Sequence, residues 1–285
     1  MILVTGATGH LGQSVVQQLK QHLSKNEFAV LARNLEKAKP YIHEHIEVRV
    51  GDFNQPESLI QAFQGIEKLL LISTMEMNRF EQHQNVIDAA RQAGVKHIYY
   101  TGLSIQNIES SAVKDLMASH FQTEEYLKQS GLHYTLLRNT MYAEAIPQII
   151  GEHALSNGIH LSGGEGKVPY VLRAELGEAT ANALMQHGHE NKSYNLVGSQ
   201  AYGYQDIAET LSELNGRQVN YEDLSEQVYQ QHLTQSGLPE FLIYLTHGTV
   251  VDIKHHQYEV QSQDLEHLLG RPSQTLAQML TNIYA

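Results

Sequence analysis

The chain has 285 residues, a formal net charge of −12 and 41% hydrophobic residues, which is enough for one large domain with an additional lobe. It contains no cysteine, so disulfides, thiolate metal sites and cysteine nucleophiles are excluded, and a cytoplasmic protein is expected. The acidic balance argues against nucleic-acid binding, no apolar run is long enough to cross a membrane, and the 17 histidines lack the companions of a metal site.

The first half of the chain alternates apolar runs with helical patterns. Strands are predicted at 1–5, 28–31, 46–50, 69–72, 98–100 and 133–137, and helices from 11, from 59, at 86–93 and at 111–129. The run at 69–72 is continuously apolar, as in a central strand that is buried on both faces. This alternation predicts an α/β fold with a doubly wound parallel sheet of the Rossmann type.

The pattern changes after Arg138. We expect a helix at 142–157, turns at 158–166, a helix at 175–185, a strand at 192–197, a helix at 204–214, a short strand at 218–221 and a mostly helical remainder. Residues 1–138 plus about 170–198 are therefore predicted to form a dinucleotide-binding domain. Residues from about 139 to 169, together with 199–285, are predicted to form a smaller, mainly α-helical substrate lobe.

A glycine-rich turn directly follows the first predicted strand. Gly6, Gly9 and Gly12 form a GxxGxxG pattern before a helical segment. In such a turn the first glycine permits the tight bend, the second lets the backbone approach a pyrophosphate, and the third allows close helix packing. The alternative is a helix start that is merely rich in glycine, but its place directly after a strand favours a phosphate site. The expected contacts are Gly6, Thr8, Gly9, His10, Leu11 and Gly12.

Arg33, at the end of the second predicted strand, indicates which dinucleotide binds. An acidic residue there would hold the ribose hydroxyl of NAD, whereas a basic residue accommodates the 2′-phosphate of NADP. Residues 30–34 contain no acid, so NADP(H) is predicted, the alternative being a solvated arginine. Ligands bind at the carboxyl ends of parallel strands. We therefore also expect contacts from Asp52 and Phe53 near the adenine, and from Ser73 and Thr74 along the ribose and diphosphate.

Several stretches resemble the NmrA-like family of atypical short-chain dehydrogenases/reductases. They are 4–12 (VTGATGHLG), 31–34 (LARN), 48–57 (VRVGDFNQPE), 68–73 (KLLLIS), 83–90 (HQNVIDAA), 94–101 (GVKHIYYT), 134–139 (YTLLRN) and 188–197 (GHENKSYNLV). The chain is most similar to the members that reduce quinones or triphenylmethane dyes with NADPH. The resemblance implies hydride transfer from NADPH to a quinone or a similar flat conjugated acceptor, without flavin or metal, and it suggests a homodimer.

The resemblance also exposes a missing pair of residues. Most of the superfamily places Tyr-x-x-x-Lys on the helix that corresponds to 111–129, but this chain has Leu116 and His120 at those positions. Epimerase or alcohol dehydrogenase chemistry, which needs that phenol as acid and base, is therefore disfavoured. A quinone is already electrophilic, so positioning supplies most of the rate and the proton comes from water or a weak acid. His120 and Tyr142 are the candidate acids; alternatively, His120 holds the ribose and Tyr142 forms a pocket wall.

The family also implies where the nicotinamide and the acceptor lie. Further cofactor contacts are expected from Met75, Thr101, Arg138 and Asn139, and acceptor contacts from Met77, Asn139, Thr140, Met141 and Tyr142. Met75 and Met77 would give an adaptable apolar wall, although core packing or an exposed loop explains them equally well. A second function stays open, because the family includes NAD(P)-sensing regulators that bind the dinucleotide without turnover and act on a partner protein.

Overall fold

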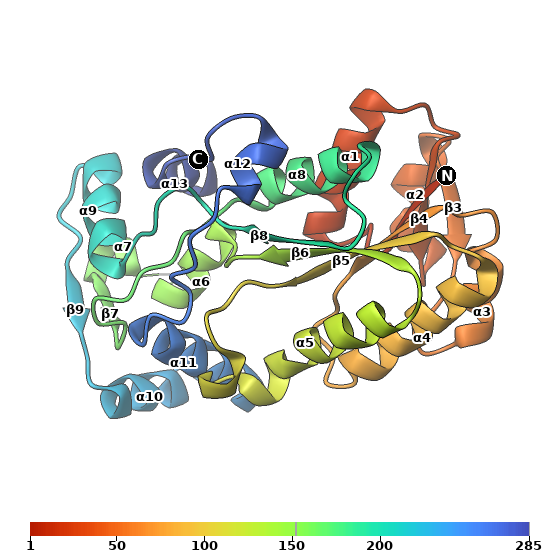
Figure 1. Cartoon of the computed structure of the whole chain (residues 1–285). Coiled ribbons are helices and arrows are strands. Elements are labelled where there is room, and N and C mark those ends of the chain that lie inside the picture. Colours follow the sequence, from red (N-terminus) through yellow and green to blue (C-terminus); the bar gives the residue numbers. More distant parts are fainter. Residues whose placement is uncertain (152, 285) are drawn as a thin grey trace.

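The computed structural model describes residues 1–151 and 153–284. Its centre is a seven-stranded parallel sheet in the order β3-β2-β1-β4-β5-β6-β8 (Figure 1). The strands are β1 (Ile2–Val4), β2 (Phe28–Ala32), β3 (Glu47–Val50), β4 (Lys68–Ile72), β5 (His97–Leu103), β6 (His133–Asn139) and β8 (Lys192–Leu196). Because the order runs outward from β1 in both directions, the predicted doubly wound Rossmann-type sheet is confirmed.

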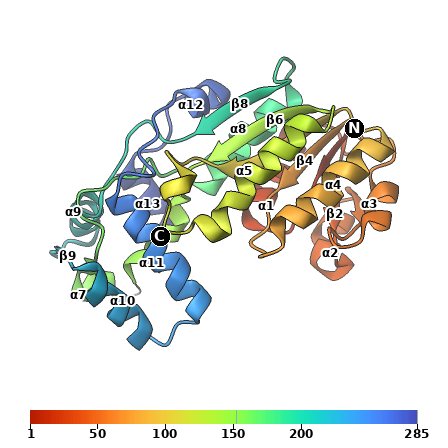
Figure 2. The ribbon, with the colours of Figure 1, turned by 60° about the horizontal axis from the view of Figure 1, so that its bottom comes forward.

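Helices cover both faces of this sheet. One face carries α3 (Pro56–Ala62), α4 (Arg79–Ala93) and α5 (Lys114–Gln129); the other carries α1 (His10–His22), α8 (Arg173–Met185) and α12 (Asp264–Leu269) (Figures 1 and 2). The helix α2 (Leu35–His43) lies beside β2 and β3. Leu69, Leu70 and Leu71 of β4 are fully buried between the two layers, which explains the continuous apolar run.

The remaining elements form a smaller, mainly helical lobe beyond the carboxyl ends of the strands (Figure 1). They are α6 (Ile146–Ile150), α7 (Ala154–Asn157), β7 (Ile159–Leu161), α9 (Tyr204–Asn215), β9 (Tyr221–Asp223), α10 (Glu226–Gln235), α11 (Glu240–Lys254) and α13 (Leu276–Tyr284). The lobe has its own apolar cluster, with Ile146, Tyr170, Ile207 and Met279 among its members. The domain limits that we expect from the sequence stay a prediction. None of the described helices combines the length and the apolar character of a membrane span.

The structure departs from the predicted elements mainly between 142 and 223. In place of one helix at 142–157, a short 3₁₀ turn (Ala143–Ala145), α6 and α7 follow one another, while residue 152 lies outside the described residues. Gly151 has φ of 91°, which a continuous helix does not permit. The turn segment contains strand β7, and the strand expected at 218–221 lies at Tyr221–Asp223, where the two pair in parallel.

Candidate active site

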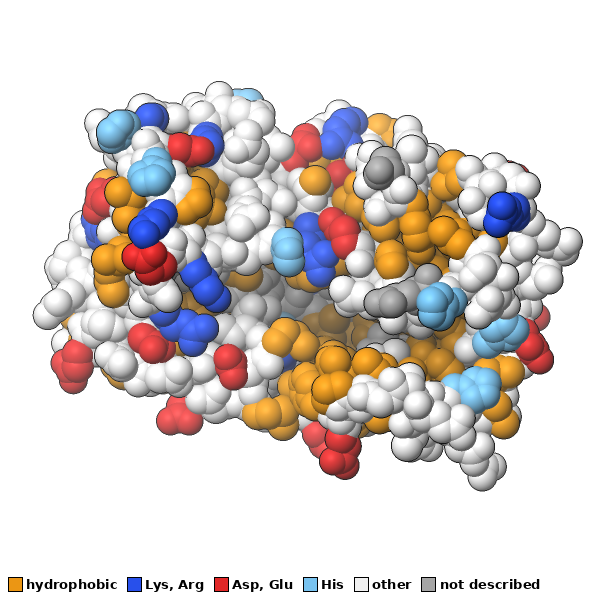
Figure 3. Space-filling view, turned by 180° about the vertical axis from the view of Figure 1, so that it is seen from behind, with side chains coloured by type: hydrophobic (Ala, Val, Ile, Leu, Met, Phe, Trp, Pro, Cys, Tyr) orange, Lys and Arg blue, Asp and Glu red, His pale blue; other side chains and the backbone are white. Residues whose placement is uncertain are grey.

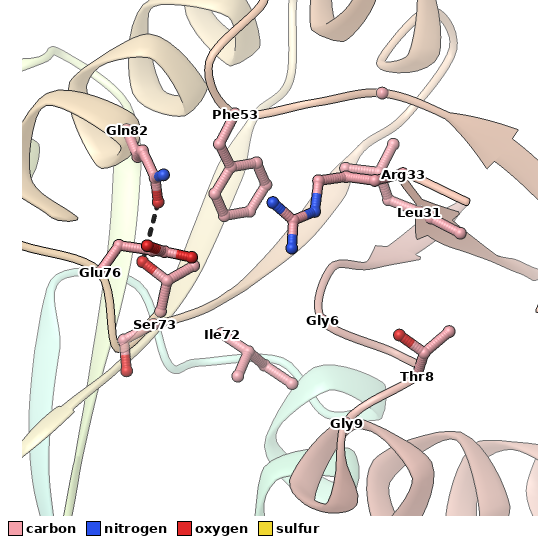
Figure 4. Close-up of a pocket in the computed structure, with 13 residues that line it drawn as sticks. Gly6, Thr8, Gly9, Leu31, Arg33, Phe53, Ile72, Ser73, Glu76 and Gln82 are labelled. Carbon is pink, nitrogen blue, oxygen red and sulfur yellow. Dashed lines mark hydrogen bonds between the residues drawn. The ribbon is translucent and has the colours of Figure 1, made fainter. Parts of the chain in front are cut away.

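A cavity of about 250 Å³ opens at the carboxyl ends of β1, β2 and β4 (Figure 4). Strand ends, the glycine turn and the start of α4 all contribute to it, as expected for a ligand site in an open α/β sheet. Its lining is formed by Gly6, Thr8, Gly9, Leu31, Ala32, Arg33, Gly51, Phe53, Ile72, Ser73, Thr74, Glu76 and Gln82.

The glycine turn has the geometry that phosphate binding requires. Gly6 has φ of 60°, and the amide of Gly9 donates to the carbonyl of Gly6 at 2.9 Å, which closes the turn. A Cβ on Gly12 would lie 2.2 Å from the Gly6 oxygen, so only glycine lets α1 pack this closely. The N-cap Gly9 offers no side-chain cap, and the first turn of α1 has no acid. The amides at this helix start are therefore suited to a diphosphate.

Arg33 supplies the cationic group of the cavity. Its guanidinium extends from the end of β2 into the space between the Phe53 ring and the Gly6 turn (Figure 4). Within residues 1–151 and 153–284, no carboxylate lies within ion-pair distance of it. The one acidic residue of the lining, Glu76, is on the opposite side of the cavity. An unpaired guanidinium beside an aromatic ring suits the adenine and 2′-phosphate of NADP.

The wall that follows β4 is fixed by hydrogen bonds. The Ser73 amide donates to Thr101 Oγ1 at 3.0 Å, and Thr74 Oγ1 donates to Gln82 Oε1 at 2.9 Å (Figure 4). Thr101 is thus placed as a support for the wall. Sequence reasoning missed Gln82 and Glu76 because it considered strand ends, whereas these residues belong to the loop and first turn that lead into α4. Their position directly after the β4 loop is the signal that could have found them.

Four residues of the glycine turn and the β3 loop that are expected as coenzyme contacts do not line the cavity. One of them is Gly12, which packs against the backbone of Gly6 and Ala7. Asp52 Oδ1 accepts the amide of Asn54 at 2.9 Å and so closes the turn that presents Phe53. Leu11 is on the buried face of α1 and packs in the core. His10 is exposed on the first turn of α1 and lines a neighbouring groove together with Arg173.

The adjacent ends of β5 and β6 hold several buried polar side-chain atoms without a hydrogen-bond partner in the described part of the chain. Asn139 is 3% exposed, and neither its amide nitrogen nor its amide oxygen has a hydrogen bond in the described part of the chain. The same is true of the buried hydroxyls of Thr140 and Ser104. An unpaired buried polar group costs free energy, so a ligand or a water bound here would be stabilised. This observation fits the nicotinamide end of a dinucleotide.

The other residues that are expected near the nicotinamide or the acceptor are either paired with protein groups, exposed, or packed in the smaller lobe. Arg138 Nε donates to Glu124 Oε1 at 2.8 Å, which commits its guanidinium to the α5 side of the sheet. Met75 and Met77 are 55% and 72% exposed, so they are not core residues. Met141 packs in part against the apolar cluster of the smaller lobe. Viewed from behind, the molecule has a hollow near its centre, with hydrophobic side chains below it and charged side chains above it (Figure 3).

Tyr142 lies under the guanidinium of Arg173, 4.3 Å from the ring centroid, and Arg173 in turn is 3.5 Å from Glu144. Burial raises the pKa of the Tyr142 phenol, while the side chain of Asn139 and the charge of Arg173 oppose that effect. The phenol therefore stays protonated at neutral pH.

His120 is 6% exposed on the face of α5 that packs against β5. Its Nδ1 lies 2.8 Å from the Tyr100 hydroxyl. Burial, followed by the positive charge of Arg79, lowers the pKa of His120 well below its usual value. The imidazole is therefore neutral at physiological pH.

Comparison with known proteins agrees with this geometry. The sequence pattern of the NmrA-like family matches residues 1–273. The chain belongs to the NmrA-like family. It is 36% identical to Quinone oxidoreductase 2 of Escherichia coli over 100% of this chain and 99% of that protein.

Comparison with solved structures agrees with the sequence comparison. An E. coli NADPH-dependent quinone oxidoreductase complexed with NADPH superposes with a TM-score of 0.92 at 36% identity, covering 100% of both chains. Triphenylmethane reductase of Citrobacter sp., complexed with NADP(H), gives a TM-score of 0.91 at 36% identity over 99% of each chain. At this level of identity, the NmrA-like protein shares its whole architecture with two NADP-binding reductases.

Proposed function

We propose that this NmrA-like protein is an NADPH-dependent reductase that transfers a hydride to a quinone or a comparable flat, conjugated acceptor, without flavin or metal. The observation that carries the proposal is the match over the entire chain to an NADPH-dependent quinone oxidoreductase at 36% identity. The cavity at the strand ends, with Arg33 unpaired inside it, supplies the matching local chemistry.

Each part of the cavity has a role in holding the coenzyme. The amides at the start of α1 would bind the diphosphate, and Arg33 would bind the 2′-phosphate in a charge-assisted contact. Phe53 would stack on the adenine, while Ser73 and Thr74 follow the ribose. When NADPH is bound, its nicotinamide supplies a hydride, that is, two electrons and one proton.

The acceptor side needs little chemistry from the protein. A quinone that receives a hydride becomes a hydroquinone anion, and one further proton completes the hydroquinone. That anion is stable enough for water to protonate it, so the site chiefly has to hold the two reactants face to face. Asn139, Thr140 and Tyr142 would anchor the acceptor, with Met77 and Met141 as apolar neighbours.

The direct test is acceptor-dependent oxidation of NADPH by the purified protein under argon. Benzoquinone, menadione and a triphenylmethane dye serve as acceptors, and NADH replaces NADPH in a parallel series. We expect turnover with NADPH that persists without oxygen. Tight NADPH binding without turnover on any of the three acceptors would contradict the proposal and would favour a dinucleotide-sensing role.

Two further properties belong to this proposal. The absence of cysteine is typical of a protein that does not depend on an oxidising compartment, and it supports a cytoplasmic location. The family resemblance supports a homodimer. Light scattering of the purified protein measures the mass against the 32.0 kDa of one chain.

A further inference from the structure

Arg79, the first residue of α4, is fully buried directly behind the wall of the cavity. Its Nε donates to the carbonyl of Thr74, a residue that lines the cavity. Its Nη1 donates to Leu116 O at 3.1 Å and to Ser119 Oγ at 2.9 Å, and its Nη2 lies 3.5 Å from the sulfur of Met75. One guanidinium therefore joins the loop that lines the cavity to the first turns of α5.

The charge of Arg79 has no counter-ion in the described part of the chain. Its hydrogen-bond acceptors are two backbone carbonyls, a hydroxyl and a thioether, and no carboxylate lies within ion-pair distance of the guanidinium. An ionised Tyr100 would stabilise the charge, but burial raises the pKa of that phenol and keeps it neutral. Arg138, in contrast, is paired with the buried carboxylate of Glu124. Since arginine does not lose its proton in proteins, Arg79 is a buried cation without compensation.

Such a cation is unfavourable, because charged side chains are almost never fully buried unless they are paired. The hydrogen bonds alone do not require it, since a neutral amide could also donate to these carbonyls. The neighbouring histidines do not relieve the charge, because burial and then Arg79 lower the pKa of both His83 and His120. His83 Nδ1 lies 2.9 Å from the hydroxyl of Thr123, a neutral partner. An anion bound in the adjoining cavity would supply the missing negative charge.

The peptide between Thr74 and Met75 connects this charge with the loop that borders the cavity. A trans peptide directs its C=O and N–H to opposite sides, so the Met75 amide points away from Arg79. That amide donates to no residue in the described part of the chain. Thr74 and Glu76, on either side of Met75, both line the cavity. The loop thus carries an unpaired N–H, which the cation at the Thr74 carbonyl polarises and strengthens as a donor.

We infer that Arg79 is a positioning residue for the coenzyme, whose charge, acting through the Thr74–Met75 peptide, favours the anionic diphosphate in the adjoining cavity. The inference rests on the proposed function, which brings the diphosphate of NADPH to the start of α1. A charge surrounded by protein is screened less than one in water, so it acts without direct contact. Arg33 has a different task, because it faces the 2′-phosphate that only NADPH carries. Arg79 should therefore act to a similar extent on NADPH and NADH.

A counter-ion placed beside Arg79 tests the charge without removing the arginine. Ser119→Asp puts a carboxylate where the Ser119 hydroxyl now accepts from Nη1, and Ser119→Asn has the same shape without the charge. Fluorescence titration in the absence of an acceptor gives the dissociation constants of NADPH and NADH. We expect Ser119→Asp to weaken both coenzymes about tenfold relative to Ser119→Asn, because the ion pair cancels the field of the guanidinium. A purely structural role of Arg79 would not be weakened by an added ion pair.

Substitutions of Arg79 itself give a second, independent measurement. Arg79→Lys keeps the charge, whereas Arg79→Gln keeps an amide donor and is neutral. Arg79→Gln should weaken NADPH and NADH about tenfold, and Arg79→Lys should bind both more tightly than Arg79→Gln. Arg91→Gln, at an exposed position of the same helix, is the control and should leave both dissociation constants unchanged. With saturating NADPH, turnover of Arg79→Gln with menadione should stay within about twofold of the parent protein, because the lost interaction belongs to coenzyme binding.

The inference is overturned if Ser119→Asp and Ser119→Asn bind the coenzymes equally well, or if the loss in Ser119→Asp is limited to NADPH. Equal losses in Arg79→Lys and Arg79→Gln would also overturn it, since the hydrogen bonds and not the charge would then be responsible. Failure of the proposed function would look different, because these dissociation constants are measured without any acceptor. A protein that shows the expected coenzyme affinities and no turnover would refute the reductase, but not the role of Arg79.

Discussion

Glu124 and Arg138 form a two-point ion pair across the sheet surface, with Nε to Oε1 at 2.8 Å and Nη2 to Oε2 at 2.5 Å. The carboxylate is 2% exposed and the guanidinium 27%. The pair joins α5 to β6. It includes Arg138, for which the family resemblance implies a contact with the coenzyme.

This geometry predicts that Arg138 acts on stability more than on coenzyme binding. Arg138→Gln leaves the Glu124 carboxylate buried without its partner, so the free energy of unfolding should fall by about 3 kcal/mol. The double variant Glu124→Gln/Arg138→Gln should lose less than the sum of the two single variants, because both partners are removed together. Urea unfolding measures these values, and NADPH titration should give a dissociation constant within about twofold of the parent protein. A much larger loss of NADPH affinity would instead return Arg138 to the cofactor site.

Arg33 should decide the choice between the two coenzymes. Arg33→Ala removes a charge-assisted contact to the 2′-phosphate, worth about 1.5–3 kcal/mol, so NADPH should bind roughly 10- to 100-fold more weakly. NADH lacks that phosphate and should change little. The measurement is the dissociation constant of each coenzyme by fluorescence titration, with Arg91→Ala, an exposed arginine of α4, as control. Equal losses for both coenzymes would place the 2′-phosphate elsewhere.

Phe53 should contribute equally to both coenzymes. Its ring borders the cavity beside Arg33, in the place where an adenine would lie. Stacking of an aromatic ring on a base is worth about 1–3 kcal/mol, so Phe53→Ala should weaken NADPH and NADH by the same factor of about 10 or more. Phe53→Tyr keeps the ring face and should bind almost normally. A loss that is restricted to NADPH would show that the ring acts through Arg33.

The sequence was most informative where local chemistry determines the structure. The glycine turn and the apolar run of β4 each need particular residue types at particular spacings, and both occur as expected. Strand β7 was missed although Ile159, His160 and Leu161 alternate in burial, because its pairing with β9 joins segments about sixty residues apart. A three-residue strand gives too short a pattern to be recognised without its partner.

The same distinction applies to the site. Arg33, Phe53 and Ser73 follow strands, so the parallel topology alone brings them to one edge. Gln82 enters the cavity only because Thr74 binds it across the loop, and Arg138 turns away only because Glu124 stands on the facing helix. Such side-chain pairs depend on tertiary contacts, which no spacing along one chain specifies.

Finally, two buried histidines should make the protein less stable in mild acid. Burial lowers the pKa of His83 to about 3 and that of His97 to about 4, from an ordinary value of 6.5. Between these values and 6.5 the unfolded chain binds protons that the folded chain does not, so stability falls as the pH drops through this window. For each histidine, the free energy of unfolding is unaffected by protonation above about pH 6.5. At about pH 5, it is lower by about 2 kcal/mol, because the unfolded chain has bound a proton there.

Urea unfolding at about pH 7.5 and pH 5 measures this loss. His83→Gln, which keeps an amide near Thr123 but does not titrate, should make the difference between the two pH values smaller by about 2 kcal/mol. His10→Gln, at an exposed position, should leave the difference unchanged. If His83→Gln and the parent protein lose the same stability between the two pH values, His83 is protonated within the folded protein and its bond to Thr123 is not that of a neutral imidazole.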